Sequence, residues 1–171
     1  SLTNTVSPAA VLPGASVVYK VVATNTNVEH SQAIADGSLT MTVPGGVTLG
    51  DWVCTATGDA TCPSSTGTGA LNLSGLSLPP GGSLAYTINA AVASTASGTL
   101  DLPASLGSQV AGASCVSGSS IPCAQTATLK VTPAATSVAP VPTLGPWSLA
   151  FLTLGLGMMG LTRCKRLRVQ R

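Results

Sequence analysis

Residues 144–162 form a run of 19 residues without a charged side chain, LGPWSLAFLTLGLGMMGLT. As an α-helix rising about 1.5 Å per residue, this run would span about 28 Å, close to the thickness of the hydrocarbon core of a bilayer. Trp147 lies near its start and a basic block follows its end, as is typical of a transmembrane helix. A buried core helix is the alternative, but the unbroken apolar surface and the abrupt basic stop fit it poorly. We expect one C-terminal transmembrane helix here.

The basic block, residues 163–171, carries five positive charges and no acid. Its cations are Arg163, Lys165, Arg166, Arg168 and Arg171. Residues 1–162 carry two lysines against five acids, a net charge of −3. By the positive-inside rule, the basic block stays in the cytoplasm and everything before Leu144 lies outside. A nucleic-acid-binding arm is the alternative, but the block contains no aromatic residue and directly follows the apolar run, so we expect no nucleic-acid partner.

A proline-rich stretch, residues 132–143 with the sequence TPAATSVAPVPT, precedes the apolar run. Its three prolines exclude a regular helix and favour an extended linker of about 3 Å per residue, roughly 35 Å in all. We therefore expect four parts: a folded domain at 1–131, a linker at 132–143, a transmembrane helix at 144–162 and a basic cytoplasmic tail at 163–171.

The expected domain has the two-residue period of half-buried strands. Apolar side chains alternate with small or polar ones from Leu84 to Val92. The same period occurs in three shorter stretches: 17–23, 39–43 and 127–131. Pro-Gly and Gly-rich turns separate these stretches, and no part of 1–131 shows a sustained helical period. These patterns predict an all-β fold, an immunoglobulin-like β-sandwich of seven to eight strands.

A short internal similarity relates two of the predicted strands. The sequence PGASVVYKV at 13–21 corresponds to PGGSLAYTI at 80–88, with an offset of 67 residues. In each copy a Pro-Gly turn leads into a strand that contains a tyrosine, Tyr19 or Tyr86. We expect both rings to point inward and both hydroxyls to reach backbone groups at the sandwich edge. We interpret the similarity as two related strand entries within one domain.

Four of the five cysteines form two local pairs with seven residues between the partners: Cys54 with Cys62, and Cys115 with Cys123. In an exported chain such pairs oxidise, so we expect two disulfides. Cross-pairing stays open because four cysteines allow three connectivities, and a four-thiolate zinc site is a further alternative, although its pairs normally enclose two to four residues. The fifth cysteine, Cys164, lies in the expected cytoplasmic tail, where we expect a free thiol; lipidation is the alternative.

Residue types suited to catalysis are few. His30 is the only histidine, and no Gly-x-Ser-x-Gly sequence supplies a nucleophile for it. The acids are scattered without calcium-loop spacing, and the glycines lie at strand turns rather than in a phosphate-binding loop. We expect no catalytic residue, no metal and no cofactor. A hydrolase would need His30 to bond both an acid and a nucleophile.

The end of the chain resembles a known sorting signal. Residues 141–171 begin VPTLGPW, continue as the apolar run and end in the basic block. They resemble the IPTL-CTERM protein-sorting domain, whose pattern is Ile-Pro-Thr-Leu, two residues, Trp-Gly, a membrane span and an Arg-rich end. The motif positions are Val141, Pro142, Thr143, Leu144 and Trp147, with Val141 in place of Ile and Ser148 in place of Gly.

This resemblance implies a Gram-negative envelope protein that is exported and held transiently in the inner membrane, with its N-terminal domain in the periplasm. It also implies a partner enzyme of the exosortase type, a membrane-embedded, transpeptidase-like cysteine enzyme. Such an enzyme cleaves near the motif and leaves the protein at the cell surface or outside the cell. The bond that it cleaves is not specified by this chain.

A second resemblance concerns residues 1–131. The segments 12–14, 25–27, 43–47, 52–56 and 78–88 are similar to the conserved-repeat family called domain of unknown function eleven. The Asp that the family has before its Leu-Pro turn is displaced here, with Asp36 as the nearest candidate. This resemblance implies an immunoglobulin-like surface module without known catalysis.

We therefore expect a non-enzymatic surface or extracellular-matrix protein with a structural or adhesive role. Its strand edges and hydroxyl-rich faces would contact envelope polymers or other copies of the chain. One alternative is a permanently anchored envelope protein. Another is a glycan- or ligand-binding module, which requires an exposed aromatic platform. Its candidates are Trp52, Tyr19 and Tyr86, at positions that we expect to be buried, with Trp52 packed on a core disulfide.

Overall fold

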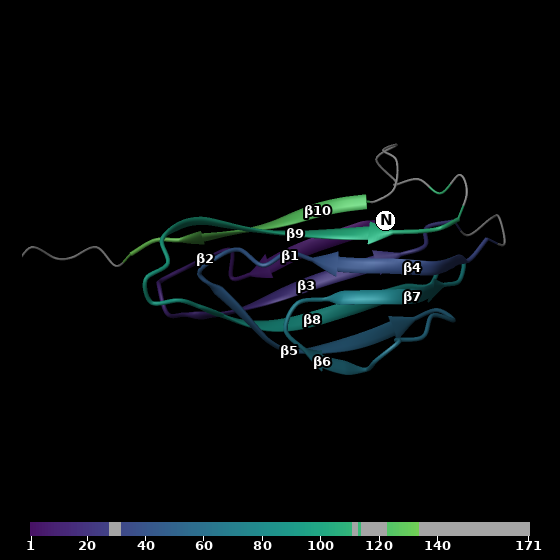
Figure 1. Cartoon of the computed structure of the whole chain (residues 1–171), viewed down its shortest axis with the longest axis horizontal. Helices are drawn as coiled ribbons and strands as arrows, with labels where there is room; N and C mark the ends of the chain where they lie inside the picture. Colours follow the sequence, from purple (N-terminus) through teal and green to yellow (C-terminus); the bar gives the residue numbers. More distant parts are fainter. Residues whose placement is uncertain (28–31, 111–112, 114–122, 134–171) are drawn as a thin grey trace, which may run out of the picture. The chain divides into compact units, whose positions relative to one another are not determined.

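The computed structural model describes residues 1–27, 32–110, 113 and 123–133. These residues contain ten β-strands (Figure 1). In chain order they are β1 (Leu2–Ser7), β2 (Ala10–Val11), β3 (Ser16–Thr24), β4 (Ile34–Met41), β5 (Val47–Thr57), β6 (Thr66–Thr68), β7 (Asn72–Leu78), β8 (Ser83–Val92), β9 (Gly98–Gly107) and β10 (Cys123–Val131). Sheet A has the order β1-β3-β8-β5-β6, and sheet B has the order β2-β10-β9-β4-β7. The all-β prediction is confirmed for the described residues.

The two sheets contain the strand order of an immunoglobulin-type sandwich. The neighbours β1-β3-β8-β5 correspond to strands A, B, E and D, and β10-β9-β4 correspond to G, F and C. The seven to eight strands that we predicted are therefore present, but β2, β6 and β7 raise the total to ten. Two of these, β2 and β6, have only two and three residues, too few for a period to show in the sequence.

The inward side chains of the predicted alternations form the core. Along β8, Leu84, Tyr86 and Ile88 have no exposed surface. Thr87 and Asn89, on either side of Ile88, are exposed. The predicted stretches at 17–23 and 127–131 lie in β3 and β10 with the same alternation. In the stretch at 39–43 the pattern is shorter, because β4 ends at Met41 and Val43 is only partly buried. Burial on one face of each sheet thus explains the two-residue period.

The internal similarity falls on two adjacent strands. Strands β3 and β8 pair antiparallel, with Tyr19 opposite Ile88 and Val21 opposite Tyr86. Both tyrosine rings point inward as predicted and are fully buried. The prediction that both hydroxyls contact backbone groups at the sandwich edge is wrong, since neither hydroxyl has a hydrogen-bond partner among the described residues. The reason is position: β3 and β8 lie inside sheet A, between β1 and β5, so their rings reach the interior rather than an edge.

All ten strands and the whole described core lie within Ser1–Ala134, which forms a compact unit of its own. A fragment that ends at Ala134 therefore contains every strand and core residue that the described fold uses. Most of the predicted linker, the predicted transmembrane helix at 144–162 and the basic tail lie outside the described residues. Within the described ranges, no helix of the length and hydropathy needed to cross a membrane occurs.

Candidate functional site

The indole of Trp52 is part of the core. Trp52 lies on β5, is 6% exposed, and makes an edge-to-face contact with Tyr86, with ring centroids 5.6 Å apart and planes at 74°. On its other side the indole lies against Gly67 of β6, so closely that a Cβ at Gly67 would clash with the ring. Trp52 and Cys54 both face the interior, two residues apart on one strand, as expected. Because the ring is enclosed, Trp52 cannot serve as a platform for a sugar.

The two tyrosines are equally unavailable to a ligand. Tyr19 and Tyr86 are both 0% exposed. Burial raises the pKa of Tyr19 to about 12 and also raises the pKa of Tyr86, because ionisation would place a phenolate in an apolar interior. The described residues include no other aromatic side chain. The aromatic platform that a glycan-binding module requires is therefore absent from the described part of the chain.

The first predicted disulfide is confirmed. Cys54 and Cys62 are bonded, with 1.99 Å between the sulfurs, a dihedral of −80° and 6.1 Å between the Cα atoms. The bond joins inward-facing Cys54 of β5 to the half-buried Cys62 in the loop before β6. Cys123, the first residue of β10, is also disulfide-bonded. Its predicted partner, Cys115, lies outside the described residues.

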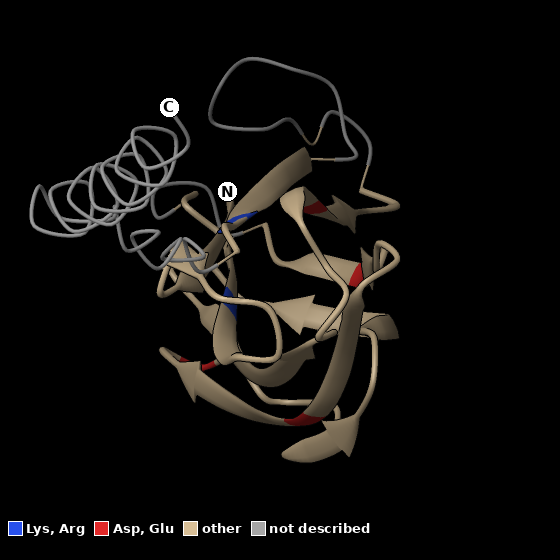
Figure 2. Ribbon diagram, turned by 90° about the vertical axis from the view of Figure 1, so that its left-hand side faces the viewer, with Lys and Arg blue, Asp and Glu red and all other residues tan. Residues whose placement is uncertain are grey.

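The carboxylates of the described residues do not converge on a site. Asp36, Asp51, Asp59 and Asp101 are all exposed and lie on different parts of the sandwich, as the separate red patches in Figure 2 indicate. No group of three His, Cys, Asp or Glu side chains within the described ranges could hold a metal ion. His30, on which a hydrolase would depend, lies outside these ranges, as do all the sorting-motif and basic-tail residues.

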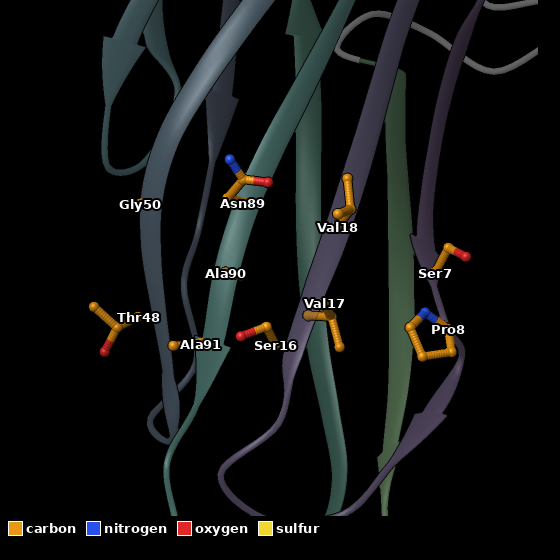
Figure 3. Close-up of a pocket in the computed structure, with 10 residues that line it drawn as sticks. All are labelled: Ser7, Pro8, Ser16, Val17, Val18, Thr48, Gly50, Asn89, Ala90 and Ala91. Atoms are coloured by element: carbon orange, nitrogen blue, oxygen red, sulfur yellow. The ribbon is translucent and has the colours of Figure 1, made fainter.

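One open pocket lies on the outer face of sheet A, which is the face turned away from the core. It has a volume of about 580 Å³ and is bordered by the end of β1, the start of β3, β8 and β5 (Figure 3). Buried Val17 and Ala90 contribute to its floor, and exposed Val18, Asn89 and Ala91 border it. The pocket was not predicted from the sequence, because the residues that line it come from four separate strands.

A β-bulge gives the pocket its shape. The pairing of β5 with β8 passes from Leu49–Ala90 directly to Trp52–Ile88, so two residues, Gly50 and Asp51, oppose one. Because Leu49 and Trp52 both pack inward, Gly50 and Asp51 together occupy the outward position beside Asn89. Gly50 has no side chain there, and Ser16 and Ala91, which also line the pocket, have small side chains, so the surface is hollow at this point.

The sheet edges are poor sites for adding another strand. Strands β2 and β6 are only two and three residues long. Strand β7 pairs with β4 through register shifts around Gly37, and its Gly75 has a positive φ of 68°. Strand β1 is tied to sheet B by buried Asn4, whose Nδ2 donates hydrogen bonds to the carbonyls of Leu102 at 2.7 Å and Gln125 at 3.3 Å. Short, bulged and covered edges resist pairing with a further chain, so the faces are better candidates for contact than the edges.

Comparison with known families identifies the C-terminal segment. Residues 139–168 match the family model of the IPTL-CTERM motif. The match includes all five predicted motif residues and the basic block up to Arg168, and it confirms the first resemblance. The resemblance to domain of unknown function eleven is not confirmed. No curated protein matches the chain.

Solved structures provide a comparison for the fold. The chain is similar to AvmM, which catalyses macrocyclization in alchivemycin A biosynthesis, with 15% identity, a TM-score of 0.51, and 81% of this chain and 92% of that chain covered. It is also similar to the collagen-binding domain of a Staphylococcus aureus adhesin (14% identity, TM-score 0.45, 75% and 96% covered). A third is the collagen-binding subdomain of the Enterococcus faecalis surface protein ACE (10% identity, TM-score 0.44, 76% and 94% covered). The likeness to AvmM shows the fold alone, and the two adhesin domains are too distant to support an argument.

Proposed function

We propose that this chain is an exported surface or extracellular-matrix protein of a Gram-negative envelope, with a structural or adhesive role and no catalytic activity. The match of residues 139–168 to the IPTL-CTERM motif carries the proposal, because this motif marks proteins sorted to the cell surface. The immunoglobulin-type strand order of the domain is compatible with the surface-module family that the sequence resembles.

The proposed route uses the charge pattern of the chain. The apolar run at 144–162 spans the inner membrane for a time, and the five cations at 163–171 keep the tail in the cytoplasm. The β-sandwich then lies in the periplasm, where an oxidising environment is compatible with the Cys54–Cys62 disulfide. An exosortase-like enzyme cleaves near the motif and delivers the domain to the surface.

A contact role for the domain is supported by its surface rather than by a reactive site. The carboxylates of the described residues are exposed and separate, and the aromatic side chains there are buried. The outer strand faces carry Ser, Thr and Ala side chains, which allow close approach of another surface. The glycan-binding alternative loses support because Trp52, its best candidate, is enclosed by Tyr86 and Gly67.

The sorting motif can be tested in cells that process IPTL-CTERM proteins. Replacing Pro142, Thr143 and Leu144 together by alanine should trap the chain in the inner-membrane fraction and reduce its amount at the surface, as measured by cell fractionation and immunoblotting. The matched control is Pro133→Ala, a linker proline outside the matched residues, which should be sorted normally. Equal surface amounts of the triple variant and the control would contradict the proposal. Retention of the unaltered chain in the membrane would favour the permanently anchored alternative.

A further inference from the structure

Two exposed aliphatic side chains lie on the outer face of sheet A. Among the described residues, the large hydrophobic side chains that are exposed are Leu12 (54%), Val18 (37%) and Val53 (51%). Val18 lies on the outer face of β3 and Val53 on the outer face of β5, so both belong to sheet A. Leu12 lies in the turn between β2 of sheet B and β3 of sheet A and belongs to neither face. None of the three lies on sheet B.

Most of the other side chains of this face are small, and they lie in cross-strand rows with Val18 and Asn89. One row runs Ser16, Ala91, Thr48, and the next runs Ser7, Val18, Asn89 and the bulge at Gly50. These two rows contain the pocket described above. Because few long side chains project from the face, another flat surface can approach it closely, as in the packing of two sheets.

The face carries one charge of each sign. Lys20 on β3 and Asp51 on β5 are separated by β8, and neither forms an ion pair with another described residue. On sheet B, by contrast, the carboxylate of Asp101 already accepts a hydrogen bond of 2.8 Å from Thr128. A two-fold axis that places Lys20 over Asp51 of a second copy also places Asp51 over the second copy's Lys20. The face is therefore complementary in charge to itself.

We propose that the outer face of sheet A is a homotypic interface, which packs face to face with the same face of a second copy. Strands lie about 4.8 Å apart and cross-strand rows about 6.8 Å apart. On that grid, the two-fold that pairs Lys20 with the other copy's Asp51 also places the other copy's Val18 over the pocket, between Asn89 and Ala91. An aliphatic side chain thus meets the hollow that the bulge creates.

The area available fits a specific but weak dimer. The five strands of sheet A contain 39 residues, and at about 4.8 by 3.3 Å per residue they cover about 620 Å² per copy. A total of about 1,240 Å² lies at the lower end of the usual range for specific protein–protein interfaces. Because each copy uses the same patch, the contact closes on itself and yields a dimer rather than a filament. The proposal does not depend on the sorting route.

The experiment uses the fragment Ser1–Ala134, which contains the complete described core and all ten strands. Sedimentation velocity over a range of concentrations should show a reversible monomer–dimer equilibrium. Thr87→Arg, in the centre of the proposed interface on β8, should weaken the dimer at least about tenfold, because it places unpaired charge between the faces. Thr126→Arg is the matched control, since this threonine is also exposed but lies on β10 of sheet B, and it should leave the equilibrium unchanged.

Charge exchange provides a second test that does not depend on a bulky substitution. Lys20→Asp or Asp51→Lys alone should each weaken the dimer about tenfold, since each dimer contains the pair twice. The double variant, and an equimolar mixture of the two single variants, should recover the affinity of the unaltered fragment. A fragment that stays monomeric up to about 1 mM, the limit of weak specific binding, would overturn the proposal. Equal weakening by Thr87→Arg and Thr126→Arg, or failure of the double variant to recover, would also overturn it.

Discussion

Replacing Gly67 by alanine tests whether Trp52 is a core residue rather than a ligand platform. Gly67 lies on β6 directly against the indole, and its φ is not positive, so the substitution adds one methyl group without backbone strain. That methyl carbon would lie 2.5 Å from Cε2 and 2.9 Å from Cη2 of Trp52. Carbon atoms in contact prefer about 3.5–4.0 Å, so the ring must move by about 1 Å.

The cost of that movement follows from what surrounds the indole. Trp52 packs edge-to-face against Tyr86 and belongs to the cluster of buried residues that forms the core. Insertion of a methyl group into a packed core costs about 1–3 kcal/mol. A value of about 2 kcal/mol in a domain of this size corresponds to a fall in Tm of about 8 °C.

Thermal and urea denaturation of the fragment Ser1–Ala134, followed by circular dichroism, would measure this change. Gly45→Ala is the control, because no atom lies within 4 Å of the added methyl, and it should leave Tm unchanged or slightly higher. Trp52→Phe removes much of the ring that causes the clash, so Gly67→Ala should cost at least about 1 kcal/mol less in that background. A Gly67→Ala variant as stable as the Gly45→Ala control would refute the burial of Trp52.

Two further predictions concern the core. Replacing Cys54 and Cys62 together by serine should lower the free energy of unfolding by about 2.5 kcal/mol, the loop-entropy value for a bridge of this separation. Urea titration of the fragment would measure this change. An unchanged midpoint would show that the bridge is dispensable. The pKa of Tyr19 is raised to about 12 in the folded state, so the unfolded chain ionises at a lower pH than the folded one. The free energy of unfolding should therefore keep its full value below pH 10 and should fall between pH 10 and 12. Urea titrations at several pH values should show a shallower decline in Tyr19→Phe than in the unaltered fragment, whereas identical slopes would contradict the assignment.

The alternation of side chains was sufficient to locate β3, β8, β10 and part of β4. A sheet that buries one face imposes a two-residue period, and the inward positions from Val17 to Ala23 and from Leu84 to Val92 follow it without exception. The short strands β2 and β6 could not be predicted, because two or three residues are too few for a period to show. The bulges at Gly37 and Gly50 also leave no periodic signal, since each depends on the register with a partner strand.

The same limit applies to the candidate sites. The Cys54–Cys62 bond was predictable because its partners are close in the sequence. The pocket was not, because four strands that are separated along the chain meet there only after the sheet has formed. The alternation does place Thr87, Asn89 and Ala91 on one outward face, but it gives no indication of what lies beside them. The tyrosine hydroxyls were misplaced because the sequence does not say which strands lie inside the sheet.

The proposed function requires that the C-terminal segment acts as a sorting signal and is removed from the mature protein. Intact-mass spectrometry of the protein recovered from the cell surface tests this most directly. We expect a mass that lacks residues 163–171, with a new C-terminus near the Val141–Trp147 motif. A surface protein that retains Arg171 would contradict it and would indicate a permanent membrane anchor.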